Sequence, residues 1–150
     1  MALKASIQED MKAAMRSRDK TRLGVIRMLL AAIQVKEIEA RGELADNDVL
    51  AVVEKLIKQR NDSAQQFAAA GRDDRAAAEL AEAEILQAYL PEQLSEAEVA
   101  ELVTAAVKDA GATSMRDMGE VMAKLRATTQ GRADMGLVSG LVKAHLSGNA

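Results

Sequence analysis

The sequence predicts an all-α protein, and three features of its composition favour this fold class. Apolar residues make up 49% of the 150 positions, which is typical of a globular protein with a core. Phe67 and Tyr89 are the only aromatic residues, so aliphatic side chains and methionine have to fill that core, and such residues favour helices. Charged residues make up 29%, as expected of helices that expose a broad polar face.

Four helices joined by short connections are expected in the first part of the chain. Their expected ranges are 3–16, 20–40, from Asp46 or Asn47 to 70–72, and 73–90. Asp19 is placed to accept backbone N–H groups at the start of the second helix. Short connections favour an antiparallel bundle, and a protruding pair formed by the long second and third helices is the alternative.

Apolar residues recur every three or four positions in each of these helices, which predicts one buried face on each. In the fourth helix this face is expected to include Leu80. The polar face of the third helix is expected to expose Arg60, together with Lys55, Lys58, Gln59, Asn61 and Asp62.

Pro91 is the only proline, and it marks the clearest boundary in the chain. A proline disfavours helical geometry at the residue before it, so the fourth helix should end at or before Leu90. We therefore expect two domains. Residues 1–90 form an N-terminal helical domain, a bundle or hairpin region, and residues 91–150 form a C-terminal three-helix tail domain.

The three helices of the tail domain each have a recognisable start. A capping box at Ser95 opens the first, which stops at Gly111, and a second capping box at Ser114 precedes a Met-rich helix. Gly131 can take the left-handed conformation that ends a connection, and Asp134 caps the last helix, over 135–146. A shared buried face is expected for the residues at three- and four-residue steps, Met115, Met118, Met122 and Leu125.

The residue types that most catalytic and metal sites need are scarce. There are no cysteines, which excludes disulfides, thiolate zinc sites and a cysteine nucleophile. His145 is the only histidine and is expected to be a partly exposed packing residue. No pair of carboxylates is flanked by the apolar residues that raise a catalytic pKa. We expect no catalytic residue, no metal and no cofactor.

The sequence also bears on location and assembly. No apolar run is long enough to cross a membrane, and the first residues lack the apolar core of a signal peptide. The expectation is a soluble, cytoplasmic monomer with no membrane partner.

The net charge of −3 is unevenly distributed along the chain. Six basic residues lie between positions 12 and 27 with Asp19 as the one acid, and nine acidic residues lie between 73 and 101 with Arg75 as the one base. A nucleic-acid-binding protein of this net charge needs such a local basic face. Solvated helix surfaces produce the same counts, so the charges alone leave both interpretations open.

Several blocks in order along the chain resemble proteins of the YqeY-like family. They lie at 8–15, 19–20, 23–28, 58–63, 67, 70–72, 89–95, 117–119 and 131–134. The most specific is Tyr-Leu-Pro-Glu-Gln-Leu-Ser at 89–95, and the resemblance covers essentially the whole chain.

The resemblance implies a function as well as a fold. The family is similar to the C-terminal helical and tail region of the GatB subunit of glutamyl/aspartyl-tRNA amidotransferase, which contacts the body of the tRNA while other parts do the chemistry. It implies a two-part helical fold and tRNA binding, or an accessory role in tRNA-dependent amidation. Any carbon–nitrogen ligase activity, with glutamine as amido-N donor, would belong to the larger complex.

The resemblance and the basic residues together give a set of candidate site residues. The candidates for nucleic-acid binding near the tail motif are Lys124, Arg126, Arg132 and Lys143. A second patch could be formed by Arg16, Arg18, Lys20 and Arg27. The motif itself comprises Met118, Gly119, Gly131, Ala133 and Asp134, with Glu120 where the family often has a basic residue.

Two other functions are weighed against tRNA binding. One is a protein–protein adaptor, whose acidic 73–101 stretch or Met-lined helix docks on an aminoacyl-tRNA synthetase or amidotransferase subunit. The other is a small amidotransferase in its own right. The second is disfavoured because the chain has no cysteine, one histidine and no amidase-like serine loop.

Overall fold

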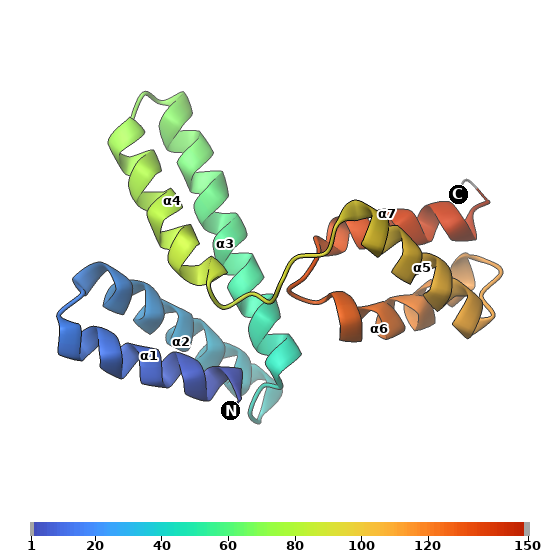
Figure 1. Cartoon of the computed structure of the whole chain (residues 1–150), viewed down its shortest axis with the longest axis horizontal. Helices are drawn as coiled ribbons and strands as arrows, with labels where there is room; N and C mark the ends of the chain where they lie inside the picture. The colour runs from blue at the N-terminus through green and yellow to red at the C-terminus, as the bar shows by residue number, and fades with distance from the viewer. Residues whose placement is uncertain (1, 149–150) are drawn as a thin grey trace. The chain divides into compact units, whose positions relative to one another are not determined.

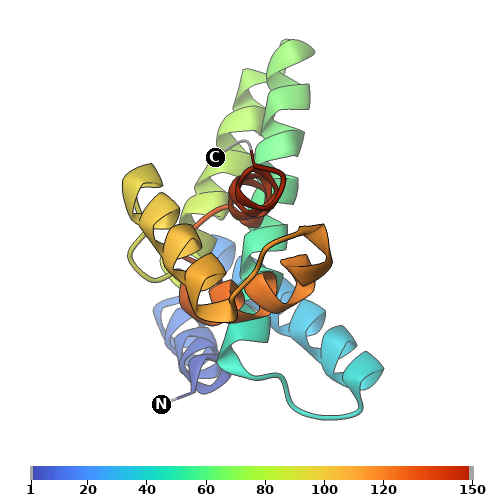
Figure 2. The same ribbon diagram turned by 90° about the vertical axis from the view of Figure 1, so that its right-hand side faces the viewer.

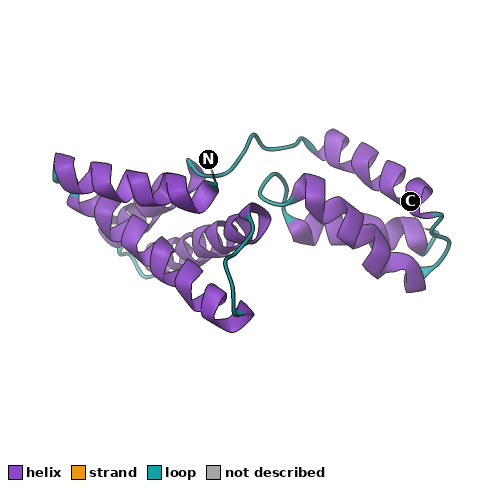
Figure 3. Cartoon of the chain, turned by 90° about the horizontal axis from the view of Figure 1, so that it is seen from below, coloured by secondary structure: helices purple, strands orange, loops and turns teal. Residues whose placement is uncertain are grey.

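The structure, a computed structural model, describes residues 2–148 and divides between Leu90 and Pro91 into two compact units. Within the described residues the regular structure consists of seven α-helices and one 3₁₀ turn, with no strand (Figure 3). The predicted all-α fold class is confirmed. The two parts are called the N-terminal unit and the C-terminal unit below.

The N-terminal unit contains four helices, and the local sequence sets where they begin and end. The helices are α1 (Leu3–Ser17), α2 (Lys20–Ala40), α3 (Asp46–Ala69) and α4 (Asp73–Gln87), labelled in Figure 1. Asp19 caps α2 by accepting a hydrogen bond from the backbone N–H of Arg22 at 3.1 Å, as expected. The helix α4 ends three residues before the expected position 90, because tight turn bonds, Tyr89 N–H to Leu86 O and Leu90 N–H to Gln87 O, replace its last turn.

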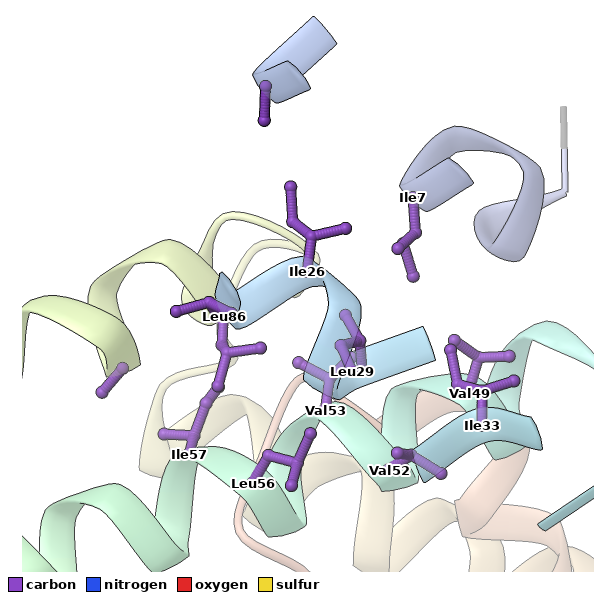
Figure 4. Packing of buried hydrophobic residues seen from close by; sticks show 13 residues of the cluster. Ile7, Ile26, Leu29, Ile33, Val49, Val52, Val53, Leu56, Ile57 and Leu86 are labelled. Atoms are coloured by element: carbon purple, nitrogen blue, oxygen red, sulfur yellow. The ribbon is translucent and has the colours of Figure 1, made fainter. Parts of the chain in front are cut away.

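Two helical hairpins share the core of the N-terminal unit. The hairpin of α3 and α4 extends away from α1 and α2, so the protruding pair is formed by α3 and α4 and not by the second and third helices (Figure 1). The side chains shown in Figure 4 fill the contact between the hairpins. The most completely buried residues of this cluster are Ile7, Val25, Ile26, Leu29, Ile33, Val49, Val53 and Leu86.

Two expectations about side chains in this unit are wrong. Leu80 is 52% exposed, because the buried face of α4 is centred on Ala83 and Leu86 and Leu80 lies to one side of it. Arg60 is only 7% exposed, because it lies on the same stripe of α3 as Leu56 and Ala64, one turn from each. Its charge is therefore inside the unit and not on the polar face.

The C-terminal unit packs three helices around a small aliphatic core. They are α5 (Glu96–Ala110), α6 (Met118–Thr129), preceded by the 3₁₀ turn Met115–Asp117, and α7 (Met135–Leu146). Both predicted capping boxes are present, although the second opens the 3₁₀ turn and not α6 itself. The residues at the centre of this core are Val99, Val103, Val121, Leu125, Val138 and Val142.

The methionine stripe lies at the edge of this core and not at its centre. Met115 is 46% exposed, and Met118 and Met122 are half-buried. The fully buried positions of α6 are Val121, Leu125 and Thr129, which follow one another at steps of one turn on the same side. The prediction of a buried face is therefore confirmed for Leu125. The three methionines predicted to share that face lie at the border of the core.

Candidate nucleic-acid interface

Three cations gather where α1 turns into α2. Arg16 lies in the last turn of α1, Arg18 is the left-handed residue of the turn with φ 58°, and Lys20 begins α2. All three are exposed, and within the described residues none of their side chains forms an ion pair or hydrogen bond. Their charges are therefore available to an external anion.

Arg27 extends this group along α2. It follows Lys20 by seven residues, which places it on the same side of the helix and about 10 Å further along. Asp19 is the one acid in this segment, and its carboxylate is held by Arg22, through the backbone N–H and a guanidinium contact at 3.5 Å. The set Arg16, Arg18, Lys20 and Arg27 is called the α1–α2 basic patch.

Tyr89 fastens the end of α4 to α1 within the same unit. Its hydroxyl donates a hydrogen bond to the Asp10 carboxylate at 2.7 Å. Burial and this carboxylate both raise the pKa of Tyr89 well above its ordinary value, so the phenol stays neutral and keeps donating. No signal in the sequence pairs these two residues, which lie 79 positions apart in the chain.

The candidates of the C-terminal unit do not form one surface. Lys124 and Arg126 are exposed on α6, but residues two positions apart point to different sides of a helix. Lys143 is exposed in the last turn of α7. Arg132 is half-buried, and its Nε donates a hydrogen bond to the backbone oxygen of Glu92 at 3.0 Å. We therefore regard Arg132 as a structural residue.

The tail motif forms the turn between α6 and α7. Gly131 has φ 79°, in the left-handed region that favours glycine, as predicted. Ala133 is buried, and Asp134 caps α7 by accepting the N–H of Gly136 at 2.9 Å. Met118 packs half-buried against the core, whereas Gly119 is exposed and has open space where a side chain would begin.

The motif at 89–95 and the tail motif bond to one another inside the C-terminal unit. The side-chain amide of Gln93 donates to the backbone oxygen of Gly131 at 2.7 Å, and the N–H of Leu94 donates to the oxygen of Arg132 at 2.8 Å. With the bond from Arg132 Nε to Glu92, these residues form what we call the linker clamp. No signal in the sequence pairs these segments, which lie 38 residues or more apart.

Two further charged residues hold the N-terminal unit together. The guanidinium of Arg60 reaches Met28 Sδ on α2 and approaches the Glu82 carboxylate on α4, with Nε 3.7 Å from its oxygen. Glu37 accepts from Lys4 Nζ at 2.7 Å and from the N–H of Leu44 at 3.0 Å. Both bonds favour the carboxylate, so the pKa of Glu37 is lowered.

Metal sites and membrane spans are both absent from residues 2–148. No group of three or more histidine, aspartate or glutamate side chains in this range could hold a metal ion. No helix in it is long and apolar enough to span a lipid bilayer.

Fold and site together define an all-α protein of two helical units that carries unpaired surface cations on each unit. A family model described as Yqey-like protein matches residues 4–146, and the chain belongs to this family.

Several curated relatives are fungal proteins named altered inheritance of mitochondria protein 41, mitochondrial. The one from Pyrenophora tritici-repentis is 33% identical over 129 residues, which are 85% of this chain and 71% of the relative. Those from Eremothecium gossypii and Saccharomyces cerevisiae strain YJM789 are each 39% identical, over 87 and 85 residues. These two alignments cover 57% and 56% of this chain, and 48% and 46% of the relatives, so here the match spans about half of each relative.

Proposed function

We propose that this chain is a tRNA-binding accessory protein linked to tRNA-dependent amidation. The observation that carries the proposal is the α1–α2 basic patch, whose four exposed cations have no partner within the described residues although the whole chain has a net charge of −3. Among the polyanions that could bind this patch, we choose tRNA because the chain resembles the tRNA-contacting region of GatB.

The chemistry of the patch suits the backbone of a folded RNA. Lysine and arginine neutralise phosphates, and a double-stranded RNA is recognised mostly through its shape and backbone. Single-stranded RNA is bound by stacking bases on aromatic rings. Both aromatic rings of this chain are already engaged, since Arg75 lies 5.8 Å from the centre of the Phe67 ring and Tyr89 is bonded to Asp10. The proposal is therefore limited to the folded body of a tRNA.

The test is a titration of the purified protein with bulk tRNA at several salt concentrations. Replacing Arg16, Arg18, Lys20 and Arg27 with alanine is expected to weaken binding and to reduce the slope of log K against log salt by about 3. A matched control replaces four exposed cations elsewhere, Lys58, Arg72, Lys108 and Arg116, and should leave the slope unchanged. Absence of binding at low salt, or equal losses in both variants, would refute the proposal.

Lys124, Arg126 and Lys143 are proposed as a secondary contact, because their charges are also exposed and unpaired within the described residues. They diverge on different helices, so each is expected to add one phosphate contact at most. A triple alanine variant should therefore reduce the salt slope less than the α1–α2 variant does.

We also propose that the protein has no catalytic activity of its own and works in the cytoplasm with a synthetase or amidotransferase component. A pull-down from RNase-treated lysate separates direct protein contact from RNA bridging. Capture of such a component after RNase treatment, without tRNA affinity, would favour the adaptor alternative. Glutamine-dependent amidation of misacylated tRNA by the isolated chain would contradict the non-catalytic role.

A further inference from the structure

The helix α2 is apolar on two sides, and only one of them is buried in the core. Ile26, Leu29 and Ile33 are fully buried on the first side. The second side carries an exposed row, Met28, Val35 and Ile38, whose exposed fractions are 40%, 54% and 70%. This row is called the α2 ridge. An exposed apolar row of this kind is a candidate contact surface.

A groove lies directly beside the α2 ridge. The second half of α2 and the first half of α3 diverge from the connection at 41–45 (Figure 2). Residues of both helices line the groove. Its volume is about 820 Å³, and its apolar floor includes Ala32, Leu44, Val52 and Leu56. Val35 belongs to both features, since it stands on the ridge and lines the groove.

The charges on the rim of the groove are ordered by sign. Glu39 and Asp48 lie near the connection at 41–45, whereas Lys36 and Lys55 lie further from it on the same two helices. Lys55 follows Asp48 by seven residues and so lies about 10 Å further along α3. Lys36 and Glu39 pair with one another at 3.1 Å, whereas Asp48 and Lys55 form no ion pair within the described residues. The two unpaired charges thus give the groove an acidic end at Asp48 and a basic end at Lys55.

We propose that this face binds a second copy of the same chain in an antiparallel, two-fold dimer. A two-fold interface uses the same patch on both copies, so the patch has to complement itself. Here a ridge and a groove lie side by side, so each α2 ridge can enter the groove of the other copy. The antiparallel arrangement also places the acidic end of one groove against the basic end of the other.

A helix of an unrelated partner would fill the groove but would leave the α2 ridge uncovered, which is why the second copy is the occupant we choose. The dimer replaces the monomer expected from the sequence. It does not depend on RNA, so it can be tested on RNA-free protein.

The first experiment is analytical ultracentrifugation of the full chain over a wide range of concentrations. Val35→Asp is expected to raise the dimer Kd by more than about tenfold, because the substitution acts twice across a two-fold interface. The matched control is Leu80→Asp, which changes a similarly exposed apolar residue on α4 and should leave the Kd unchanged. Circular dichroism verifies that both variants fold. A monomer at every concentration, or a dimer that Val35→Asp leaves intact, overturns the proposal.

The second experiment tests the antiparallel arrangement by reversing charges. Asp48→Lys and Lys55→Glu are each expected to raise the Kd about threefold, because each change places like charges together at two symmetric positions. The double variant Asp48→Lys/Lys55→Glu reverses both ends of the groove and keeps them complementary, so the Kd should return toward the original value. A double variant weaker than either single one overturns the antiparallel dimer.

Discussion

The ion pair between buried Arg60 and half-buried Glu82 gives an asymmetric prediction for stability. Glu82→Ala is expected to lower the free energy of unfolding by about 1–2 kcal/mol, whereas Arg60→Met should change it by less than about 1 kcal/mol. Removing the carboxylate leaves the guanidinium of Arg60 without its ion-pair partner, in a side chain that is only 9% exposed. The Nε of this guanidinium has no hydrogen-bond partner within the described residues even when Glu82 is present. Methionine removes that buried charge and keeps an unbranched apolar stem beside Met28 and Leu56.

The magnitude follows from the exposure of the two partners. Removing one member of a fully buried pair costs about 3–5 kcal/mol, but Glu82 is 33% exposed, so water can replace part of what Arg60 loses. The same exposure lets Glu82 remain hydrated when Arg60 is replaced. Glu84→Ala is the matched control, since this exposed carboxylate of α4 forms no ion pair with Arg60 and should lie within about 0.5 kcal/mol of the original chain.

Urea unfolding followed by tyrosine fluorescence measures this effect in one unit alone. Tyr89 is the only tyrosine and the chain has no tryptophan, so the signal reports the N-terminal unit. If Arg60→Met costs as much as Glu82→Ala, the ion pair is a net stabiliser and our reasoning about its desolvation is wrong.

Three further predictions concern single residues. Ser95→Ala removes a capping box and should lower the stability of the C-terminal unit by about 1 kcal/mol in thermal melts; an unchanged melt contradicts this. Gln93→Ala opens the linker clamp, so the amide of Leu94 should exchange its hydrogen faster, and unchanged exchange would refute the clamp. The lowered pKa of Glu37 gives stability that is present above its ordinary value of 4.5 and is lost as the pH falls through the folded value. Glu37→Gln should therefore flatten the acid limb of Tm against pH, whereas an unchanged limb would rule out this contribution.

Most of the fold could be predicted because its signals are local. The caps at Asp19, Ser95, Ser114 and Asp134 and the left-handed Gly131 each depend on residues a few positions apart. The wrong predictions of buried residues arise because the spacing of apolar residues indicates which face of a helix is buried but not where the centre of that face lies. Leu80 and the methionines of α6 keep the helical period and still lie beside the buried stripe, because the neighbouring helix decides where that stripe is centred.

Much of the site could not be predicted because it depends on contacts between distant segments. The sequence identified the cations at the α1–α2 turn and the cap at Asp19, which are local features. It could not show that, within the described residues, no carboxylate from a distant segment pairs with these cations. Arg132 looks in sequence like any surface cation, and only the fold brings it to the backbone of Glu92. A charged residue also looks polar wherever it lies, so periodicity gave no reason to place Arg60 inside.

The linker clamp limits the length of chain that joins the two units. Tyr89 is tied to Asp10 on one side and Gln93 to Gly131 on the other, so the tether between these anchors is a few residues long and spans on the order of 10–15 Å. Under the proposed tRNA binding, an RNA held by one unit would meet the other unit at a high effective concentration, roughly millimolar for short tethers. Two weak sites would then act together with a raised overall affinity, and cleavage of the Leu90–Pro91 bond would abolish that gain while leaving each proposed phosphate contact in place.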